Sequence, residues 1–466
     1  MITRLEIDGF KSFADFSVDL PPFVAIVGPN ASGKSNIFDA MAFLERVVSS
    51  PVAEALARGR GEPVEQFRLR GDGSRVRAMR FSVDLLVEKR VDDDFGTSAE
   101  VTHTRLRYRI DIEQRLDERG VERPFIAEES IRPIPKGEDV AMQGVTRSFA
   151  DEHLLYRASQ WKILETETRE DGRRVFSLKG ARPGGGPGRN REIPAQQAVS
   201  SVLTSVTTAI EFPFLYAVRR EILSWRFLQL EPSALRQPSV AGAPVDHLDT
   251  SGRNLAWVLE TVRQAQEAAG GAGLDTLAAD LARVITGFRS IAVRPNEARG
   301  QWELELHSRE EGAFSARVAS DGTLRLLALL TALYEPDRPG VLCLEEPENG
   351  INPRRLTAML AVLRQLVTDP HEAEGGSGGL VQLIVSSHSP LLPLRMEPDE
   401  LLVVDTVSLV EDGVGASRIT RARRIVRNRE QMELGDGADW SPLPPHQRER
   451  LSGITPEDGE RIVDAG

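Results

Sequence analysis

The feature that most constrains the fold of this chain is a pair of glycines directly after a short apolar run. Residues 23–27 are apolar, and Gly28 and Gly33 then open the pattern G-x-x-x-x-G-K-S, which Lys34 and Ser35 complete. The glycines allow a tight turn whose backbone N–H groups can surround an anion, and a helix-like pattern follows. This order of strand, glycine-rich loop and helix predicts a phosphate-binding loop.

The residues of this loop have distinct expected roles. Lys34 should neutralise the β- and γ-phosphates of a nucleotide, and the hydroxyl of Ser35 should bind Mg²⁺. The backbone N–H groups of the turn should surround the β-phosphate. The expected nucleotide-binding residues are Gly28, Pro29, Asn30, Ala31, Ser32, Gly33, Lys34, Ser35 and Asn36.

A second feature is the stretch "VLCLEEPENG" at residues 341–350, in which an apolar run ends in glutamates. Such a run indicates a buried strand whose last residues emerge at a sheet edge, where adjacent carboxylates repel unless a cation lies between them. Beside a phosphate-binding loop, Glu345 is expected to hold Mg²⁺ through water, and Glu346 to polarise the water that attacks the γ-phosphate. The alternative is an acidic loop after a core strand, which suits a solvated Glu348 but accounts poorly for the tandem acids.

Composition limits the class of protein. The chain has 466 residues and a single cysteine, Cys343, so it can hold two or three packed units but no disulfide or zinc framework within one chain. No apolar run approaches the length of about 18 residues that a membrane helix needs, and residues 1–10 lack the pattern of a secretory signal. We therefore expect a cytoplasmic protein without a membrane partner.

Two arginine-rich stretches could bind phosphates locally, although the formal net charge of -12 argues against a wholly basic nucleic-acid-coating protein. One covers residues 67–80, and the other runs from Arg418 to Arg429. Stretches of this kind are more often solvated faces than binding sites. The second stretch is the candidate for contact with nucleic acid or an acidic partner, because its isolated apolar residues cannot support a large core.

The order of patterns along the chain predicts an α/β fold interrupted by a long insertion. Runs with strand periodicity between residues 64 and 131 indicate an antiparallel sheet. Glycine and proline at 179–191 separate that sheet from a largely helical part. The predicted units are an N-terminal nucleotide-binding lobe with the phosphate loop and antiparallel sheet at 1–178, a helical insertion at 192–290, a C-terminal lobe of the same fold at 291–429 and a polar tail at 430–466.

Two further motifs lie in the C-terminal lobe. A strand expected over residues 314–320 leads into Ser320, Asp321 and Gly322 at the start of an apolar helix, where a hydroxyl and free N–H groups suit an anion. His388 stands just beyond a buried strand. Taken singly, the first motif would more often be an ordinary helix cap and the second a satisfied loop histidine.

The order of all these motifs resembles the ABC-type ATPases of the SMC, RecF and overcoming-lysogenization-defect branch. The stretch "LEIDGFKSF" at residues 5–13 is similar to the first strand and turn of SMC-type heads. The stretch "EEPENGINP" at residues 345–353 is similar to the acidic strand and following loop of RecF- and overcoming-lysogenization-defect-like ATPases. The resemblance implies an ATPase head with a mixed, largely parallel core sheet, an antiparallel β lobe and an inserted, mainly helical subdomain.

The resemblance also implies that a pair of heads hydrolyses ATP with Mg²⁺. Ser320, Asp321 and Gly322 would form a signature that closes, in trans, on the γ-phosphate held by the partner subunit. Asn349 would cross the same interface, and His388 would contact the γ-phosphate. Such a dimer is physically reasonable because ATP between two surfaces forms charge-assisted hydrogen bonds with both of them.

The sequence departs from the family pattern in several places. The signature reads "SDGT", which weakens a transporter-like interpretation, and Gln66 is the candidate for the glutamine that would join the metal site. Heptads for a long coiled coil are missing. About sixty residues follow Asp405, too few for the nuclease domain of the overcoming-lysogenization-defect nucleases. We therefore expect any effector on a separate chain.

Three functions remain open from the sequence. The leading hypothesis is a stand-alone ATPase that dimerises on ATP and serves as the sensor or motor of a prokaryotic anti-phage defence or DNA-transaction complex. The second is a RecF-like DNA-repair clamp, for which the stretch that begins at Arg418 is the local support. The third is a scaffold that uses ATP as a structural ligand, in which case Glu346→Gln would change neither turnover nor assembly.

Overall fold

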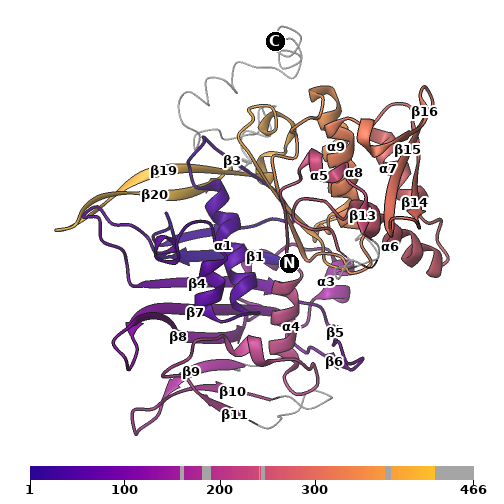
Figure 1. The fold of residues 1–466 in the computed structure, drawn as a ribbon. Coiled ribbons are helices and arrows are strands. Elements are labelled where there is room, and N and C mark those ends of the chain that lie inside the picture. Colours follow the sequence, from indigo (N-terminus) through magenta and orange to yellow (C-terminus); the bar gives the residue numbers. More distant parts are fainter. Residues whose placement is uncertain (158–161, 181–189, 241, 243–246, 373–378, 426–466) are drawn as a thin grey trace.

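The structure is a computed structural model that describes residues 1–425 apart from 158–161, 181–189, 241, 243–246 and 373–378. The expected polar tail at 430–466 lies outside the described residues, as do Arg427 and Arg429 of the second arginine-rich stretch. Figure 1 shows an antiparallel sheet in the lower half of the molecule and helices α8 and α9 at the upper right.

The antiparallel sheet confirms the expected β lobe but is larger than expected, because residues 2–19 add two strands at one edge and Arg191–Pro194 add one at the other. The expectation that the stretch at 179–191 separates this sheet from the following part was therefore wrong, since the strand Arg191–Pro194 still pairs within the sheet. Along β7 the side chains of Tyr108 and Ile110 are buried, whereas the intervening Arg107 and Arg109 pair with Asp84 and Asp111 on the opposite face. This period-2 alternation is what a sheet with one buried face requires. The strand order is β11 (Arg191–Pro194), β10 (Arg174–Leu178), β9 (Leu164–Thr168), β8 (Glu122–Pro133), β7 (Arg105–Leu116), β4 (Ala78–Leu86), β1 (Ile2–Asp8) and β2 (Phe16–Asp19).

A second, mixed sheet forms the centre of the molecule. Its strands pair in parallel except for the antiparallel hairpin β19–β20 at one edge. In β3, Val24 and Ile26 face one hydrophobic core, while Ala25 and Val27 face another. Burial on both faces explains the unbroken apolar runs in the sequence. The order is β12 (Arg226–Leu228), β17 (Val341–Glu345), β18 (Gln382–Ser387), β3 (Phe23–Val27), β19 (Leu401–Glu411) and β20 (Gly415–Arg424).

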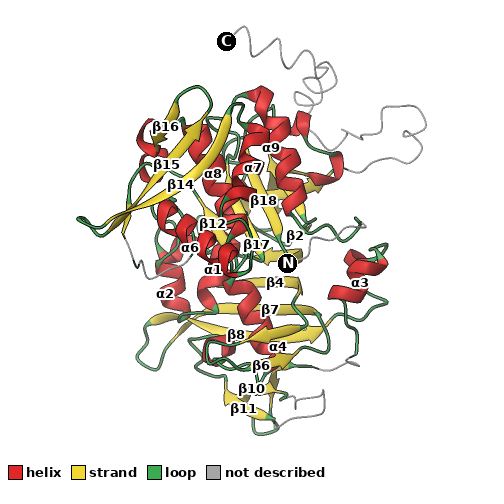
Figure 2. Cartoon of the chain, turned by 90° about the vertical axis from the view of Figure 1, so that its right-hand side faces the viewer, coloured by secondary structure: helices red, strands yellow, loops and turns green. Residues whose placement is uncertain are grey.

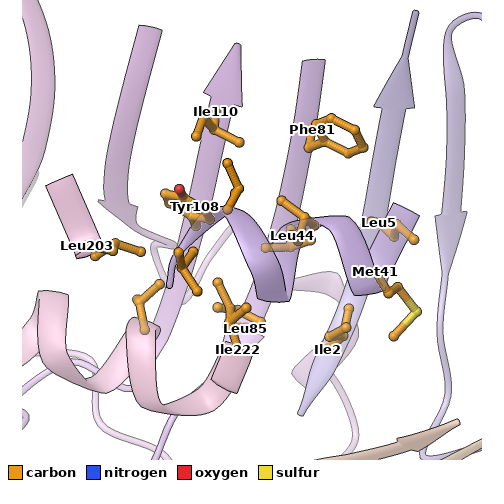
Figure 3. Packing of buried hydrophobic residues seen from close by; sticks show 14 of the residues in the cluster. Ile2, Leu5, Met41, Leu44, Phe81, Leu85, Tyr108, Ile110, Leu203 and Ile222 are labelled. Carbon is orange, nitrogen blue, oxygen red and sulfur yellow. The ribbon is translucent and has the colours of Figure 1, made fainter. Parts of the chain in front are cut away.

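The first core lies between the antiparallel sheet and the helices that cover it. Figure 3 shows Met41 and Leu44 of α1 packed toward Ile2, Leu5 and Phe81 of the sheet. Met41 and Leu44 stand at helical spacing on α1, so one face of the helix is buried. The helices of this core are α1 (Lys34–Val47), α2 (Val52–Ala57) and α4 (Pro213–Leu223).

The second core lies on the other face of the mixed sheet, where a small antiparallel sheet joins further helices (Figure 2). Residues 192–290 contribute to both cores, because α4 packs in the first while α6 and α7 pack in the second. The helices are α5 (Pro232–Leu235), α6 (Leu255–Ala268), α7 (Asp275–Val284), α8 (Asp321–Tyr334) and α9 (Pro353–Leu366), and the strands are β13 (Ser239–Val240), β14 (Phe288–Asn296), β15 (Gln301–Ser308) and β16 (Gly312–Ser315).

The strand expected over residues 314–320 is shorter than the sequence suggested. β16 ends at Ser315, whose hydroxyl accepts from the N–H of Arg317 and so caps a short 3₁₀-helix, η4 (Ala316–Val318). A serine that hydrogen-bonds the backbone two residues on favours a turn over a strand. The remaining elements are β5 (Arg90–Asp92), β6 (Ser98–Glu100), α3 (Arg147–His153), η1 (Pro63–Gln66), η2 (Val140–Met142), η3 (Val202–Ser205), η5 (Pro393–Arg395) and η6 (Pro398–Glu400).

No helix among residues 1–425, as far as these are described, has both the length and the apolar character needed to cross a membrane. The long apolar stretches are instead distributed over the short strands of the mixed sheet and over α8.

A buried carboxyl group at the end of α8 makes stability depend on pH. One oxygen of Glu335 accepts the N–H of Leu248 at 2.7 Å, and the other is buried without a partner among the described residues. Burial raises the pKa of Glu335 to about 8, although the charge of Arg226 opposes this shift. In the unfolded chain a glutamate has its ordinary pKa of 4.5. Between this pH and about 8, the folded protein therefore keeps a proton that the unfolded chain releases.

We expect the free energy of unfolding to fall as pH rises from about 4.5 through about 8, and Glu335→Gln to remove this part of the dependence. Each unit of pKa difference corresponds to about 1.4 kcal/mol, so Glu335→Gln should be more stable than wild type at pH 9 by a few kcal/mol. Urea unfolding of both proteins at pH 5 and pH 9 checks this. A difference between them that is the same at both pH values would contradict it.

Candidate functional site

The topology of the mixed sheet places the predicted motifs at one edge. β3, β17 and β18 run in parallel, with Glu345 paired to Ser386 and Ser387 paired to Val27. The residues that follow these strands therefore emerge together at their carboxyl ends, where ligands bind in open α/β sheets. Segments separated by more than 300 residues in sequence meet here: the phosphate loop after β3, the acids at the end of β17 and His388 after β18.

The phosphate loop joins β3 to α1 and adopts backbone conformations that its sequence allows. Gly33, with φ of 98°, caps the N-terminus of α1, and Ala31 also has a positive φ of 62°. Lys34 lies back across the loop, and its Nζ donates to the carbonyl oxygens of Gly28 at 2.7 Å and Pro29 at 2.9 Å. Partial burial lowers the pKa of Lys34, while the carboxylates of Glu346 and Glu345 act in the opposite direction.

The loop is suited to an anion of several negative charges. Within the described chain, the N–H groups of Gly33, Lys34 and Ser35 have no hydrogen-bond acceptor. They stand at the N-terminus of a helix of 14 residues, whose dipole favours negative charge. Free donors, a lysine and a helix dipole at one place fit the phosphates of a nucleotide.

Glu346 is held in an unusual backbone conformation directly after β17. Its φ is 52°, which a non-glycine residue rarely adopts, and its N–H donates to the carbonyl oxygen of Ser386 at 2.8 Å. One carboxylate oxygen lies 2.6 Å from Nδ1 of His388, and the other accepts from the side chain of Asn349. A strained residue with three anchors at a sheet edge is a candidate for a catalytic role. The structure thus brings together Glu346, His388 and Asn349, which the sequence singled out separately.

Glu345 belongs to a chain of charges that the sequence did not indicate. The Nη2 atom of Arg60 lies 3.4 Å from Oε1 of Glu345, and its Nε atom lies 2.9 Å from Oδ1 of Asp39 in α1. Asp39 also binds Nζ of Lys11 at 2.7 Å. These side chains connect the turn after β1, the helix after the phosphate loop and the end of β17. Arg60 stands in a glycine-rich stretch without regular structure, so no periodicity in the sequence pointed to it.

Gln66 hydrogen-bonds to the backbone of two residues in this chain of charges, Arg60 and Lys11. The side-chain amide of Gln66 donates to the backbone carbonyl oxygen of Arg60 at 2.6 Å. The backbone carbonyl oxygen of Gln66 accepts from the backbone N–H of Lys11 at 2.8 Å. The side chain is buried at the end of η1. Its assignment as a metal ligand stays a prediction.

A Mg²⁺ ion would find two oxygen donors of its preferred kind at this edge, Ser35 and Glu345. Among the described residues there is no group of three or more His, Cys, Asp and Glu side chains that could hold a metal ion. Mg²⁺ does not need such a cage, because it usually keeps several waters and binds through one or two carboxylates and substrate phosphates. The residues present therefore fit this ion.

Glu348 is not solvated, contrary to the expectation for the loop after β17. It is half-buried, and one of its oxygens accepts from the hydroxyl of Ser387. Burial raises the pKa of Glu348, against the effect of that hydrogen bond. The loop "EEPENG" turns back onto β18, and this long-range packing could not be read from the local sequence.

The Ser320, Asp321 and Gly322 motif begins α8 and touches the same loop. The hydroxyl of Ser320 accepts from the N–H of Thr323 at 3.2 Å, as an N-cap does, and Asp321 pairs with Arg236. A Cβ atom placed on Gly322 would lie 2.1 Å from the carbonyl oxygen of Gly350. The signature glycine therefore packs on the loop that carries Asn349 in its own chain.

The two arginine-rich stretches differ in how they are paired. In the first, Arg68 forms a bidentate pair with Glu411, and Arg80 pairs with Asp111. In the second, Arg418 and Arg421 of β20 are exposed. The first stretch is thus largely engaged inside the chain, and the second offers the more accessible cations.

Family models match two separate parts of the chain. A model described as "AAA ATPase domain" matches residues 1–115, which include the phosphate loop. A model described as "AAA domain, putative AbiEii toxin, Type IV TA system" matches residues 209–395, which include the signature, the tandem acids and His388.

Curated relatives share shorter segments. The chromosome partition protein Smc of Bordetella petrii is 36% identical over 110 residues, which are 22% of this chain and 9% of that protein. Smc of Bacillus subtilis is 42% identical over 96 residues, 20% of this chain and 7% of that protein. Smc of Methanocaldococcus jannaschii is 54% identical over 44 residues, 9% of this chain and 4% of that protein. The matched segments thus make up less than a tenth of each relative.

Solved structures of SMC heads align along most of the chain at low similarity. The head bound to the C-winged helix domain of ScpA has a TM-score of 0.46 and 12% identity, covering 91% of this chain and 98% of that one. The SMC head domain from Thermotoga maritima has a TM-score of 0.40 and 11% identity, covering 91% and 99%. The order of the motifs, the two family models and the local identity to Smc proteins make the chain similar to ABC-type ATPases of the SMC- and RecF-like branch.

Proposed function

We propose that this chain binds ATP and hydrolyses it to ADP and phosphate at the carboxyl edge of β3, β17 and β18. The observation that carries the proposal is the meeting, at one edge, of free loop N–H groups, Lys34 and a strained Glu346 that both His388 and Asn349 contact. Phosphoryl transfer requires mainly positioning and charge stabilisation, and these groups supply both.

Each side chain has a role that follows from its position. The loop N–H groups and Lys34 bind the phosphates, and Lys34 must leave the carbonyls of Gly28 and Pro29 to do so. Glu346 orients the attacking water and accepts its proton, while His388 holds the carboxylate in place. Mg²⁺, held through Ser35 and Glu345, would supply positive charge for the phosphate oxygens.

The proposal extends to self-association and a partner. ATP would be closed between two copies of the chain, with Ser320 and Asn349 reaching the partner's nucleotide, as the resemblance to ABC-type heads implies. The descriptions of the matching proteins, a chromosome partition protein and a domain of a toxin–antitoxin system, support a role beside DNA or in defence, with the effector on another chain. A DNA-clamp function has the exposed Arg418 and Arg421 as its support.

The first test compares Lys34→Ala with wild type. Loss of the ammonium group should weaken ATP binding by at least about tenfold, because it removes charge-assisted hydrogen bonds to phosphate. Calorimetric titration with ATP and Mg²⁺, and phosphate release, measure the two effects. Lys136→Ala, which changes an exposed lysine elsewhere, serves as the control and should bind as wild type does. Absence of ATP binding by wild type, or equal affinity of Lys34→Ala, would contradict the proposal.

A further inference from the structure

We propose that the β19–β20 hairpin is part of the nucleotide site and that Thr420 of β20 is a positioning residue for the phosphate loop. Thr420 is buried, with an exposed fraction of 2%, although it follows the phosphate loop by almost 400 residues. Its hydroxyl lies against the loop and not against solvent. Thr420 lies within the arginine-rich stretch that begins at Arg418, and the G-x-x-x-x-G-K-S pattern does not include it.

A directed chain of hydrogen bonds joins Thr420 to both ends of the loop. The Oγ1 of Thr420 donates to the carbonyl oxygen of Ser32 at 3.2 Å, and it lies 2.7 Å from Oγ of Ser12. Since a hydroxyl has one proton, Ser12 must donate to Thr420. Ser12 in turn accepts from the side-chain amide of Asn36 at 2.8 Å, in the first turn of α1. The chain therefore runs from α1, through Ser12 and Thr420, back to the loop.

This chain fixes the orientation of one peptide plane. The carbonyl of Ser32 and the N–H of Gly33 belong to the same planar, trans peptide, so they point in opposite directions. By holding the carbonyl toward β20, Thr420 turns the N–H of Gly33 away from β20. That N–H has no acceptor within the described chain and stands at the N-terminus of α1. The hydroxyl of Thr420 thus keeps a phosphate donor aimed correctly before any phosphate is present.

The shape of the hairpin also explains which loop positions are glycine. A Cβ atom on Gly33 would lie 2.0 Å from Oγ1 of Thr420, and one on Gly28 would lie 2.1 Å from the carbonyl oxygen of Val404 in β19. Both strands of the hairpin therefore approach the loop closely. A movement of β19 or β20 would shift the loop, so the hairpin and the nucleotide should be coupled.

The inference rests on the proposed ATP binding, and it is tested by replacing Thr420 in two ways. Thr420→Val keeps the branched shape but removes the hydroxyl, and should weaken binding of ATP and of ADP by about tenfold. Thr420→Ser keeps the hydroxyl and should bind within about twofold of wild type. Calorimetric titration with each nucleotide gives the affinities, and phosphate release at saturating ATP should change less than the Michaelis constant does.

A merely structural role is separated by two further variants. Thr331→Val removes the hydroxyl of a fully buried threonine that donates to Leu327 within α8, far along the helix from its N-terminus. Thr331→Val should lower the melting temperature about as much as Thr420→Val does, but it should leave nucleotide affinity unchanged. Ser12→Ala should weaken binding as Thr420→Val does. The double variant Ser12→Ala/Thr420→Val should bind nucleotide no more weakly than either single variant, because both changes interrupt the same chain of hydrogen bonds.

The outcomes distinguish a failure of this inference from a failure of the proposed ATP binding. If wild type does not bind ATP, the proposed function fails. If wild type binds ATP and Thr420→Val binds it equally well, or if Thr420→Ser is as weak as Thr420→Val, the hydroxyl does not position the loop. Equal loss of affinity in Thr331→Val would assign the effect to general stability and overturn the inference.

Discussion

Replacing Glu346 by glutamine is expected to lower the rate of ATP hydrolysis by at least about 100-fold while leaving ATP bound. The amide keeps the size of the side chain and can still meet His388, but it cannot accept a proton from water. ATP affinity should remain within a few-fold of wild type, because the loop and Lys34, which we propose hold the phosphates, are unchanged. Phosphate release and calorimetric titration measure these two quantities separately.

The same variant tests assembly, since ATP that cannot be hydrolysed should hold two copies together. Mass determination in solution with ATP and Mg²⁺ should show a larger species for Glu346→Gln than for wild type. Glu348→Gln is the matched control: its carboxylate is two residues further on and accepts from Ser387, whereas His388 and Asn349 bond to the carboxylate of Glu346. It should lose less than tenfold in rate. Equal turnover and equal mass for Glu346→Gln and wild type would instead support a scaffold that uses ATP only as a ligand.

The sequence was most informative where contiguous residues form a pattern that indicates both a local structure and the ligand it binds. Strand, glycine-rich loop and helix occupy contiguous residues, so backbone geometry alone predicts β3, the loop and α1. The apolar run before Glu345 likewise predicted β17, and parallel topology then required its carboxyl end to lie near the loop. His388 was singled out by its place after a buried strand and Asn349 by the family resemblance, but their meeting at Glu346 needed the structure.

Contacts between distant segments were beyond the reach of the sequence. Thr420 belongs to a strand whose sequence indicates an arginine-rich face, and no periodicity relates it to a loop almost 400 residues earlier. Arg60 stands in a stretch without regular structure, so its approach to Glu345 depends on how the whole lobe packs. The prediction for Glu348 was wrong for a similar reason, because its burial follows from the loop turning onto β18.

Gly322→Ala is expected to reduce hydrolysis by at least about tenfold, for a reason that lies within one chain. The added Cβ would lie 2.1 Å from the carbonyl oxygen and 2.8 Å from the carbonyl carbon of Gly350. Neither atom belongs to a flexible side chain, so either the first turn of α8 or the loop with Asn349 must move. Asn349 is one of the anchors of Glu346, and its displacement should release the carboxylate that we propose to be catalytic. Overpacking of this kind also costs about 1–3 kcal/mol of stability.

Leu330→Ala, in the buried middle of the same helix, separates the loss of stability from the displaced loop. It should destabilise the protein by about 2–5 kcal/mol yet keep most of the turnover when both variants are assayed below their unfolding transitions. Similar turnover in Gly322→Ala and Leu330→Ala would contradict the argument from the loop.

Mixing Gly322→Ala with Lys34→Ala decides whether the signature glycine acts within its own chain or across a dimer. In a mixed dimer, one site would combine Lys34 and Glu346 of the Gly322→Ala chain with an intact signature from the other chain. If Gly322 matters only in trans, that site is complete and hydrolysis should return. If it matters through its own loop, Glu346 at that site is still displaced, and the mixture should stay as inactive as the separate variants. The contact between Gly322 and Gly350 favours the second result, because it couples the start of α8 to the carboxylate of Glu346 before any partner is bound.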